Sequence, residues 1–222
     1  MSFYDQLMTE TAGDREAFLS IPIVQHAIRR GASRALYLDF LTEAYHHVKH
    51  TFPLLALAAS RTSDERYQDA LVEYMKEERG HEKWILDDIG AIGGNPDDVR
   101  DGIPGMPCQI MVGYAYYAIE RISPYAFLGS VHVLEGISVM LAGKLADALK
   151  TSLGQESDAG FTYLRTHGSL DVEHIALFRS LVDGFDDAAT RRIVIDNARI
   201  FYRLYGAIFQ DLGLRAELSD AA

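Results

Sequence analysis

The chain of 222 residues is long enough for one domain with a substantial core, and its 48% hydrophobic content is that of an ordinary globular protein. Its formal net charge of −11 argues against nucleic acid or an anionic membrane as the main partner, because both require clustered Lys and Arg. Cys108 is the single cysteine, which excludes an intrachain disulfide and a thiolate metal cage.

The first 30 residues favour short, interrupted helices. The apolar-rich stretch 17–28 contains Pro22, which should end one helix and start another, and Gly31 closes the segment. This N-terminus lacks the cationic and apolar regions of a signal peptide, and no apolar run in the chain reaches membrane-spanning length. We therefore expect a soluble, cytoplasmic protein without a membrane partner.

Two long helices are predicted next, each with apolar residues recurring on one face. Ser33 is suited to cap the first, over residues 33–60, and Pro53 should kink it. A Ser-Asp pair starts the second, over residues 63–89. Residues 90–107 then form one long loop rich in glycine and proline, which we interpret as a connection with defined turns or a lid.

The second half of the chain continues the helical pattern. An aromatic-rich helix over residues 108–122 precedes Pro124, and the next helix ends at Gly154. Ser157 or Asp158 opens a further helix, and an Asp-Asp pair begins the last one. Because no segment alternates like a strand, the pattern predicts a single all-α domain over residues 1–222, a bundle of about seven helices.

The most informative motif is His-x-x-x-Asp-x-x-His in the helix that follows Gly154. It places His167, Asp171 and His174 at i, i+4 and i+7, so that all three point the same way on a helix. Two imidazoles and a carboxylate that converge from one helical face suit iron or a similar divalent ion. The motif therefore predicts half of a metal site.

Two other places in the sequence offer the remaining ligands. Glu78 and His81 stand at i, i+3, a spacing by which one helix can present a carboxylate and an imidazole to a single point. Glu77 is the competing carboxylate, and spacing leaves the choice between the two open. Glu135 lies among apolar residues, where a carboxylate is costly to bury unless it is paired with a cation or metal.

A rival cluster repeats the same spacing in the helix over residues 33–60. Glu43, His47 and His50 stand at i, i+4 and i+7, so they could form a ligand set, face a haem, or line a substrate cavity. Tyr114 and Tyr117 are further candidates for the cavity wall.

The order Glu-x-x-His, lone Glu, His-x-x-x-Asp-x-x-His resembles the haem-oxygenase-like di-iron oxidases and oxygenases, within the superfamily of TenA-type and pyrroloquinoline-quinone-synthase-type proteins. The resemblance implies an O2-dependent enzyme that acts on a small amino-acid-like or fatty-acid-like metabolite. Two irons, one of them weakly held, would be bound by Glu78, His81, Glu135, His167, Asp171 and His174. The self-sacrificing members carry a carboxylate seven residues before the first histidine, where this chain has Tyr74, so the match is to the Glu-x-x-His subgroup.

Three other functions stay open at the level of sequence. A haem-binding or haem-oxygenase-type protein would use His47 or His50 as axial ligand. A TenA/PqqC-like enzyme without a metal, if of the thiaminase type, needs a nucleophilic cysteine, and the position of Cys108 at a helix start could lower its pKa. The third is a non-catalytic metal-binding protein. A homodimer is expected on general grounds.

Overall fold

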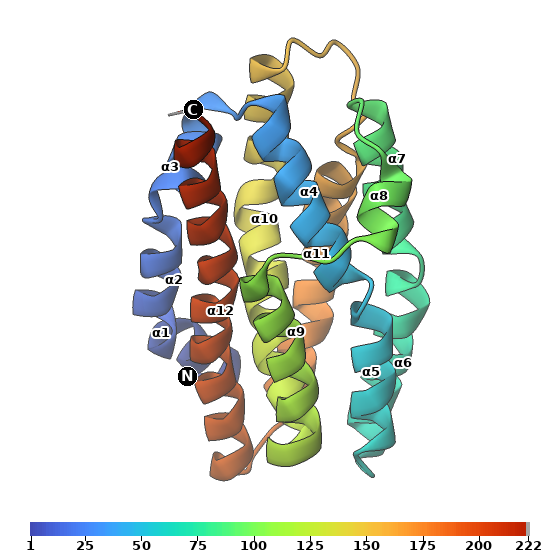
Figure 1. The fold of residues 1–222 in the computed structure, drawn as a ribbon. Helices are drawn as coiled ribbons and strands as arrows, with labels where there is room; N and C mark the ends of the chain where they lie inside the picture. The colour runs from blue at the N-terminus through green and yellow to red at the C-terminus, as the bar shows by residue number, and fades with distance from the viewer. Residues whose placement is uncertain (221–222) are drawn as a thin grey trace.

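The computed structural model describes the backbone of residues 1–220 and the side chains of residues 1–167 and 174–217. Within that part of the chain the protein is entirely helical, and the helices lie roughly along one direction as a bundle (Figure 1). In chain order the α-helices are α1 (Phe3–Glu10), α2 (Ala12–Leu19), α3 (Pro22–Arg30), α4 (Arg34–Val48), α5 (Thr51–Ser60), α6 (Glu65–Glu78), α7 (His81–Ala91), α8 (Pro96–Asp101), α9 (Met106–Tyr117), α10 (Phe127–Ser152), α11 (Thr162–Val182) and α12 (Ala188–Asp220). A π-helical turn (Ala118–Ile122) and a 3-10 turn (Pro124–Ala126) separate α9 from α10.

The core is organised around α10. Its first half, with Leu128 and Val133, belongs to the larger of two apolar clusters, and its second half, with Ala146 and Leu149, belongs to the smaller one. By length and composition alone the segment Pro124–Ser152 could cross a membrane, but 56% of its most apolar stretch is buried inside the bundle, as suits a core helix. The expectation that no apolar run reaches membrane-spanning length therefore does not hold for this segment by length and composition alone.

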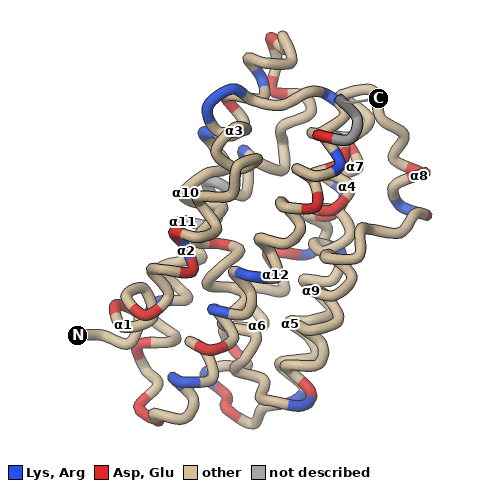
Figure 2. The backbone as a smooth tube through the Cα atoms, turned by 60° about the vertical axis from the view of Figure 1, so that its left-hand side comes forward, with Lys and Arg blue, Asp and Glu red and all other residues tan. Residues whose placement is uncertain are grey.

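Charge is distributed unevenly among the helices. The helices α5 and α9 contain no charged residue and are drawn as continuous tan segments in Figure 2, whereas acidic and basic positions are interspersed along the other helices. The net negative charge of the chain is therefore carried outside these two elements.

The prediction of about seven helices is wrong, because two long predicted helices are each broken, a short helix lies in the predicted loop, and the first 30 residues form three helices. The helix over residues 33–60 breaks at Lys49 and His50, just before Pro53, which is tolerated in the first turn of α5. The helix over residues 63–89 breaks at Arg79 and Gly80. The loop over residues 90–107 contains α8, capped by the side chain of Asn95.

Several predicted helix starts are confirmed by their capping bonds. The side chain of Ser33 accepts from the N–H of Leu36, and that of Asp64 accepts from the N–H of Tyr67, each at 3.2 Å. Asp187 caps the last helix in the same way.

The start of α11 differs from the prediction, and the difference positions the candidate site. The helix begins at Thr162, and no side chain from the preceding residues caps it. Instead the carboxylate of Asp88, from α7, accepts from the N–H of Thr162 at 2.9 Å and of Tyr163 at 2.8 Å. Asp88 is buried, and burial raises its pKa. One buried carboxylate thus joins α7 to the N-terminus of α11.

Candidate metal centre

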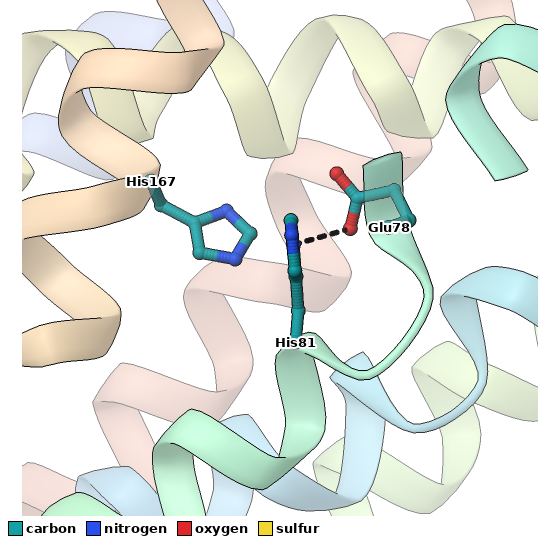
Figure 3. A group of neighbouring side chains, drawn as sticks. All are labelled: Glu78, His81 and His167. Atoms are coloured by element: carbon teal, nitrogen blue, oxygen red, sulfur yellow. Dashed lines mark ion pairs between the residues drawn. The ribbon is translucent and has the colours of Figure 1, made fainter. Parts of the chain in front are cut away.

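Three side chains from different helices meet inside the bundle. Glu78 ends α6, His81 begins α7 and His167 lies on α11. Their potential ligand atoms all lie within 4.8 Å of one another, and the side chains point toward a common space in Figure 3. Glu78 and His81 are buried, with the His81 Nδ1 3.1 Å from a Glu78 carboxylate oxygen.

The prediction that Glu78 and His81 share one helix is wrong, although the two side chains do meet. Arg79 is extended, and Gly80 has a φ of 97°, in the left-handed region that favours glycine. Between them these two residues end one helix and start the next. The tight turn, and not an i, i+3 helical spacing, brings the carboxylate and the imidazole to the same point (Figure 3).

His174 extends the cluster and adds one further carboxylate, Glu135. It lies two helical turns after His167, and its Nδ1 is 3.5 Å from Glu135 Oε1 and 3.8 Å from Glu78 Oε1. Glu78 therefore lies between two sets of donors, one with His81 and His167 and the other with Glu135 and His174. The side chain of Asp171, the remaining predicted ligand, lies outside the residues that the structure describes.

The structure separates the two adjacent carboxylates of α6. The side chain of Glu78 is 8% exposed and faces the donor cluster, whereas that of Glu77 is 49% exposed and lies 2.5 Å from the Nε2 of His174. A neutral imidazole that donates from Nε2 presents a lone pair at Nδ1, which is the atom that faces Glu78 and Glu135. The geometry favours Glu78 as ligand and Glu77 as the group that orients His174.

Aromatic rings surround the donors. Trp84 stacks on His81 with ring centroids 4.0 Å apart, and Tyr163 packs against His167 at 4.8 Å. The hydroxyl of Tyr74 lies 3.2 Å from the backbone oxygen of His174 and 3.4 Å from Glu135 Oε2. These rings fix the imidazoles and reduce the access of water. The contacts of Tyr74 and Glu77 could not be found from the sequence, because they depend on how α6 packs against α10 and α11.

A cavity of about 180 Å³ reaches the donor cluster. Aliphatic and aromatic side chains from α3, α4, α5, α9, α10, α11 and α12 form most of its wall, and its described lining contains no Lys or Arg. The ionisable residues that line it are His47, Tyr37, Tyr74, Glu78, Glu135, Tyr163, His167 and Tyr205. Most of these belong to the donor cluster or touch it, so the rest of the cavity wall is mostly apolar.

Among the five candidate cavity residues, His47 does line the cavity. Burial, with smaller contributions from His167 and His50, lowers the pKa of His47 to about 3. His47 is therefore neutral at pH 7 and can exchange hydrogen bonds with a polar group in the cavity.

Glu43, from the same rival cluster, lies elsewhere. Its carboxylate oxygens accept from the N–H of Gly105 at 3.0 and 3.1 Å, and one of them lies 2.9 Å from Arg215. Glu43 is thus a buried structural carboxylate that joins α4 to the α8–α9 loop and to α12.

The other three candidates are also outside the cavity lining. The Nδ1 of His50 is 3.0 Å from the hydroxyl of Tyr116, and the hydroxyl of Tyr114 donates to Asn197 Oδ1 at 2.7 Å. Tyr117 is 55% exposed. Their polar atoms are directed to neighbouring helices or to solvent and not toward a substrate.

Cys108 is unsuited to act as a nucleophile. It is fully buried, and its thiol lies 3.6 Å from the carbonyl oxygen of Glu43. Burial and the nearby Glu43 raise its pKa to about 12, the opposite of the lowering expected at a helix start.

Comparison with known proteins identifies the family of this chain. Residues 38–206 match the model of a family of iron-containing redox enzymes, Haem_oxygenas_2, over more than half of the chain. The chain belongs to this family. Its fold is haem-oxygenase-like, as the resemblance in the sequence implied.

Several solved structures share the fold of this member of the iron-containing redox enzyme family. A domain of unknown function with a haem-oxygenase-like fold from Shewanella denitrificans OS217 is 22% identical, with a TM-score of 0.87 and coverage of 98% of this chain and 94% of that one. A TenA homologue from Pseudomonas syringae is 11% identical (TM-score 0.77, coverage 96% and 93%). Haem oxygenase-1 from the cyanobacterium Synechocystis, in complex with haem, is 12% identical (TM-score 0.77, coverage 100% and 96%). No curated protein matches the chain.

Proposed function

We propose that this protein is an O2-activating, non-haem di-iron oxidoreductase. The observation that carries the proposal is the buried Glu78–His81–His167 cluster in a member of an iron-containing redox family. Imidazole and carboxylate donors without sulfur suit ferrous iron. The buried Nδ1 of His81 lies 3.1 Å from Glu78 Oε2 without hydrogen-bond geometry, and a metal held by both groups would satisfy it.

The arrangement of the donors supports two ions. One would be held by Glu78, His81 and His167, and the other by Glu135 and His174 with Asp171, while Glu78 lies within reach of both. Iron, when bound, would supply the electrons that reduce O2. Two neighbouring side chains would prepare the histidines for metal binding. Glu77 fixes the tautomer of His174, and Trp84 shields His81 from water.

The cavity supports a fatty-acid-like substrate over an amino-acid-like one. An amino acid would place two charged groups, an ammonium and a carboxylate, and little apolar surface against a wall that is mostly apolar outside the donor cluster. A substrate with one apolar chain would bury that chain against the aliphatic wall and place its polar head near His47 and the iron. The homodimer and the cytoplasmic location stay predictions.

Anaerobic Fe(II) titration tests the metal site. We expect about two Fe(II) per chain in the wild type, loss of both in Glu78→Ala, and loss of the weaker one in His174→Ala. His26→Ala, at an exposed histidine, is the matched control and should bind as the wild type does. If the wild type binds no iron while its circular dichroism shows a folded protein, the proposal fails.

A displacement assay on the metal-free protein tests the substrate class separately. A fluorescent fatty acid should be displaced by saturated fatty acids and not by free amino acids. Ala142→Phe, which narrows the apolar part of the cavity, should weaken the binding of long chains more than that of short ones. Displacement by amino acids alone would reverse the assignment of substrate class without touching the iron site.

Haem binding is the second candidate function, because His47 lies in the cavity and could act as an axial ligand. The lack of Lys and Arg in the described lining weighs against it, since haem propionates are anionic. A Soret band after haem addition, abolished in His47→Ala, would favour this function. Iron binding without O2 uptake in the presence of fatty acids would favour a non-catalytic metal-binding protein.

A further inference from the structure

A second cavity, of about 140 Å³, lies against the donor cluster from another side. The two cavities use opposite faces of α10, because Leu134, Ser138 and Leu141 line the first, and Gly136 and Met140 line the second. Glu135 stands between these faces and lines both cavities. The second cavity therefore reaches a proposed iron ligand without passing through the substrate cavity.

The second cavity extends from the surface to this carboxylate. Val139 and Met140, at its outer part, are 37% and 38% exposed, whereas Phe178 is fully buried. Most of the wall is apolar, with contributions from α1, α10, α11 and α12; α1 and α2 lie beside α12 in Figure 1. The polar side chains in the wall are Tyr4, Arg15, His132, Glu135 and Tyr202.

Apolar parts of protein cavities bind small apolar molecules such as xenon, and most of this wall is apolar. Dioxygen belongs to this chemical class. In the proposed function a fatty-acid-like chain fills the first cavity before O2 reacts, so O2 needs a route that the chain does not block. We propose that the second cavity is that route, an entry path for dioxygen that ends at Glu135. The inference rests on the proposed function for its role, but the cavity can be probed without iron.

Gly136 provides a means to close this path. A Cβ built at Gly136 meets no heavy atom within 4 Å, so a larger side chain can enter the cavity without displacing the backbone. Gly143, seven residues later on the same face of α10, is equally open and lines neither cavity. Gly136→Phe and Gly143→Phe therefore make the same change in helix propensity and differ in whether the ring blocks the path.

The first experiment uses metal-free protein and xenon as a probe. Xenon should shift the NMR signals of the Met8 and Met140 methyl groups in the wild type and in Gly143→Phe, but not in Gly136→Phe. Xenon shifts confined to residues of the first cavity would overturn the proposal. Loss of the shifts in both variants would do the same, because the effect would then not depend on the path.

The second experiment uses iron-loaded protein saturated with a long-chain fatty acid. The second-order rate of Fe(II) oxidation by O2 should fall by about tenfold or more in Gly136→Phe and stay at the wild-type value in Gly143→Phe. Iron stoichiometry and fatty-acid affinity, measured on the same samples, should be equal in all three proteins. Equal oxidation rates with normal iron content would reject the entry path alone, whereas absence of iron in the wild type would reject the proposed function.

Discussion

Asp88 shows how much one buried side chain contributes to the candidate site. Its carboxylate provides acceptors for two N–H groups at the start of α11, the helix that carries His167 and His174. Asp88→Ala should remove the acceptor of both partly buried N–H groups and lower the free energy of unfolding by about 1–3 kcal/mol. Asp88→Asn keeps one carbonyl acceptor and should lose less. Urea unfolding measures both, and equal losses for the two variants would show that capping is not the cause.

His132 should make stability depend on pH. The Thr11 hydroxyl donates to the Leu7 carbonyl oxygen, so it accepts from His132 Nε2 at 3.2 Å. Burial, with Arg15 nearby, lowers the pKa of His132 from 6.5 to about 4. A depressed pKa means that the unfolded chain takes up the proton first as pH falls. The stability contributed by neutral His132 is therefore complete above pH 6.5 and is lost as pH falls toward 4.

The measurement is the free energy of unfolding at pH 7.5 and pH 5.0. His132→Phe should remove about 2 kcal/mol of the loss that the wild type shows between these two values. His26→Gln, at an exposed histidine, is the control and should keep the full loss. A pH dependence unchanged in His132→Phe would contradict this explanation.

Residue spacing pointed to three side chains that the structure brings together, Glu78, His81 and His167, but not to their surroundings. Glu43, His47 and His50 have the same i, i+4, i+7 spacing as the motif on α11, yet only His47 lines the cavity. Spacing fixes which residues share a helix face, and the packing of other helices decides what that face meets. Hence the sequence could give His81 and His167 as a pair of candidate ligands, while the partners of Glu43 and His50 had to come from the structure.

At the scale of elements, local signals explain which helix boundaries could be predicted. Ser33, Asp64 and Asp187 cap their helices through bonds to residues two or three positions later, and such bonds are encoded in a few neighbouring residues. The break at Lys49 and His50 has no capping side chain, and Pro53 predicted only a kink there because the apolar periodicity continues across it. The number of helices was therefore underestimated although the helical class was correct.

The break at Gly80 did have a local signal, since glycine is costly inside a helix. Gly80→Ala should destabilise the protein by about 1–2 kcal/mol, because an L-residue is strained at a φ of 97°. No neighbour crowds the position, the nearest atom to an added Cβ being Lys83 Cδ at 4.0 Å, so the effect should come from the backbone. The same strain should shift Glu78 relative to His81 and weaken Fe(II) binding.

Gly154→Ala is the matched control for that change. Gly154 also has a positive φ, 62°, with open space around it, but it ends α10 far along the chain from the donor residues. It should lose a similar amount of stability in urea unfolding and keep normal Fe(II) affinity. Equal Fe(II) affinity in the two variants would mean that the turn at Gly80 does not position the ligands.

At the scale of the whole molecule, Glu43 joins parts of the chain that are far apart in sequence. Its buried carboxylate binds the Gly105 N–H and Arg215, so that α4, the α8–α9 loop and the end of α12 meet at one group. Arg215 is itself 38% exposed and also lies 3.0 Å from Asp211. The contacts among these three parts of the chain therefore depend mainly on the Glu43 carboxylate, because solvent screens its ion pair with the partly exposed Arg215.

Glu43→Gln should consequently cost more stability than Arg215→Met. The first change removes the charge that serves both donors and should lower the free energy of unfolding by about 1–3 kcal/mol, while the second leaves the Gly105 N–H bond in place. Urea unfolding of both variants and of the double variant gives the coupling between the two groups. Fe(II) titration of Glu43→Gln adds a decisive readout, because Glu43 repeats the spacing of the ligand motif but is held away from the cavity. We expect Glu43→Gln to be less stable than the wild type and to bind the same amount of iron. Loss of iron in this variant would place Glu43 among the metal ligands and contradict the proposed ligand set.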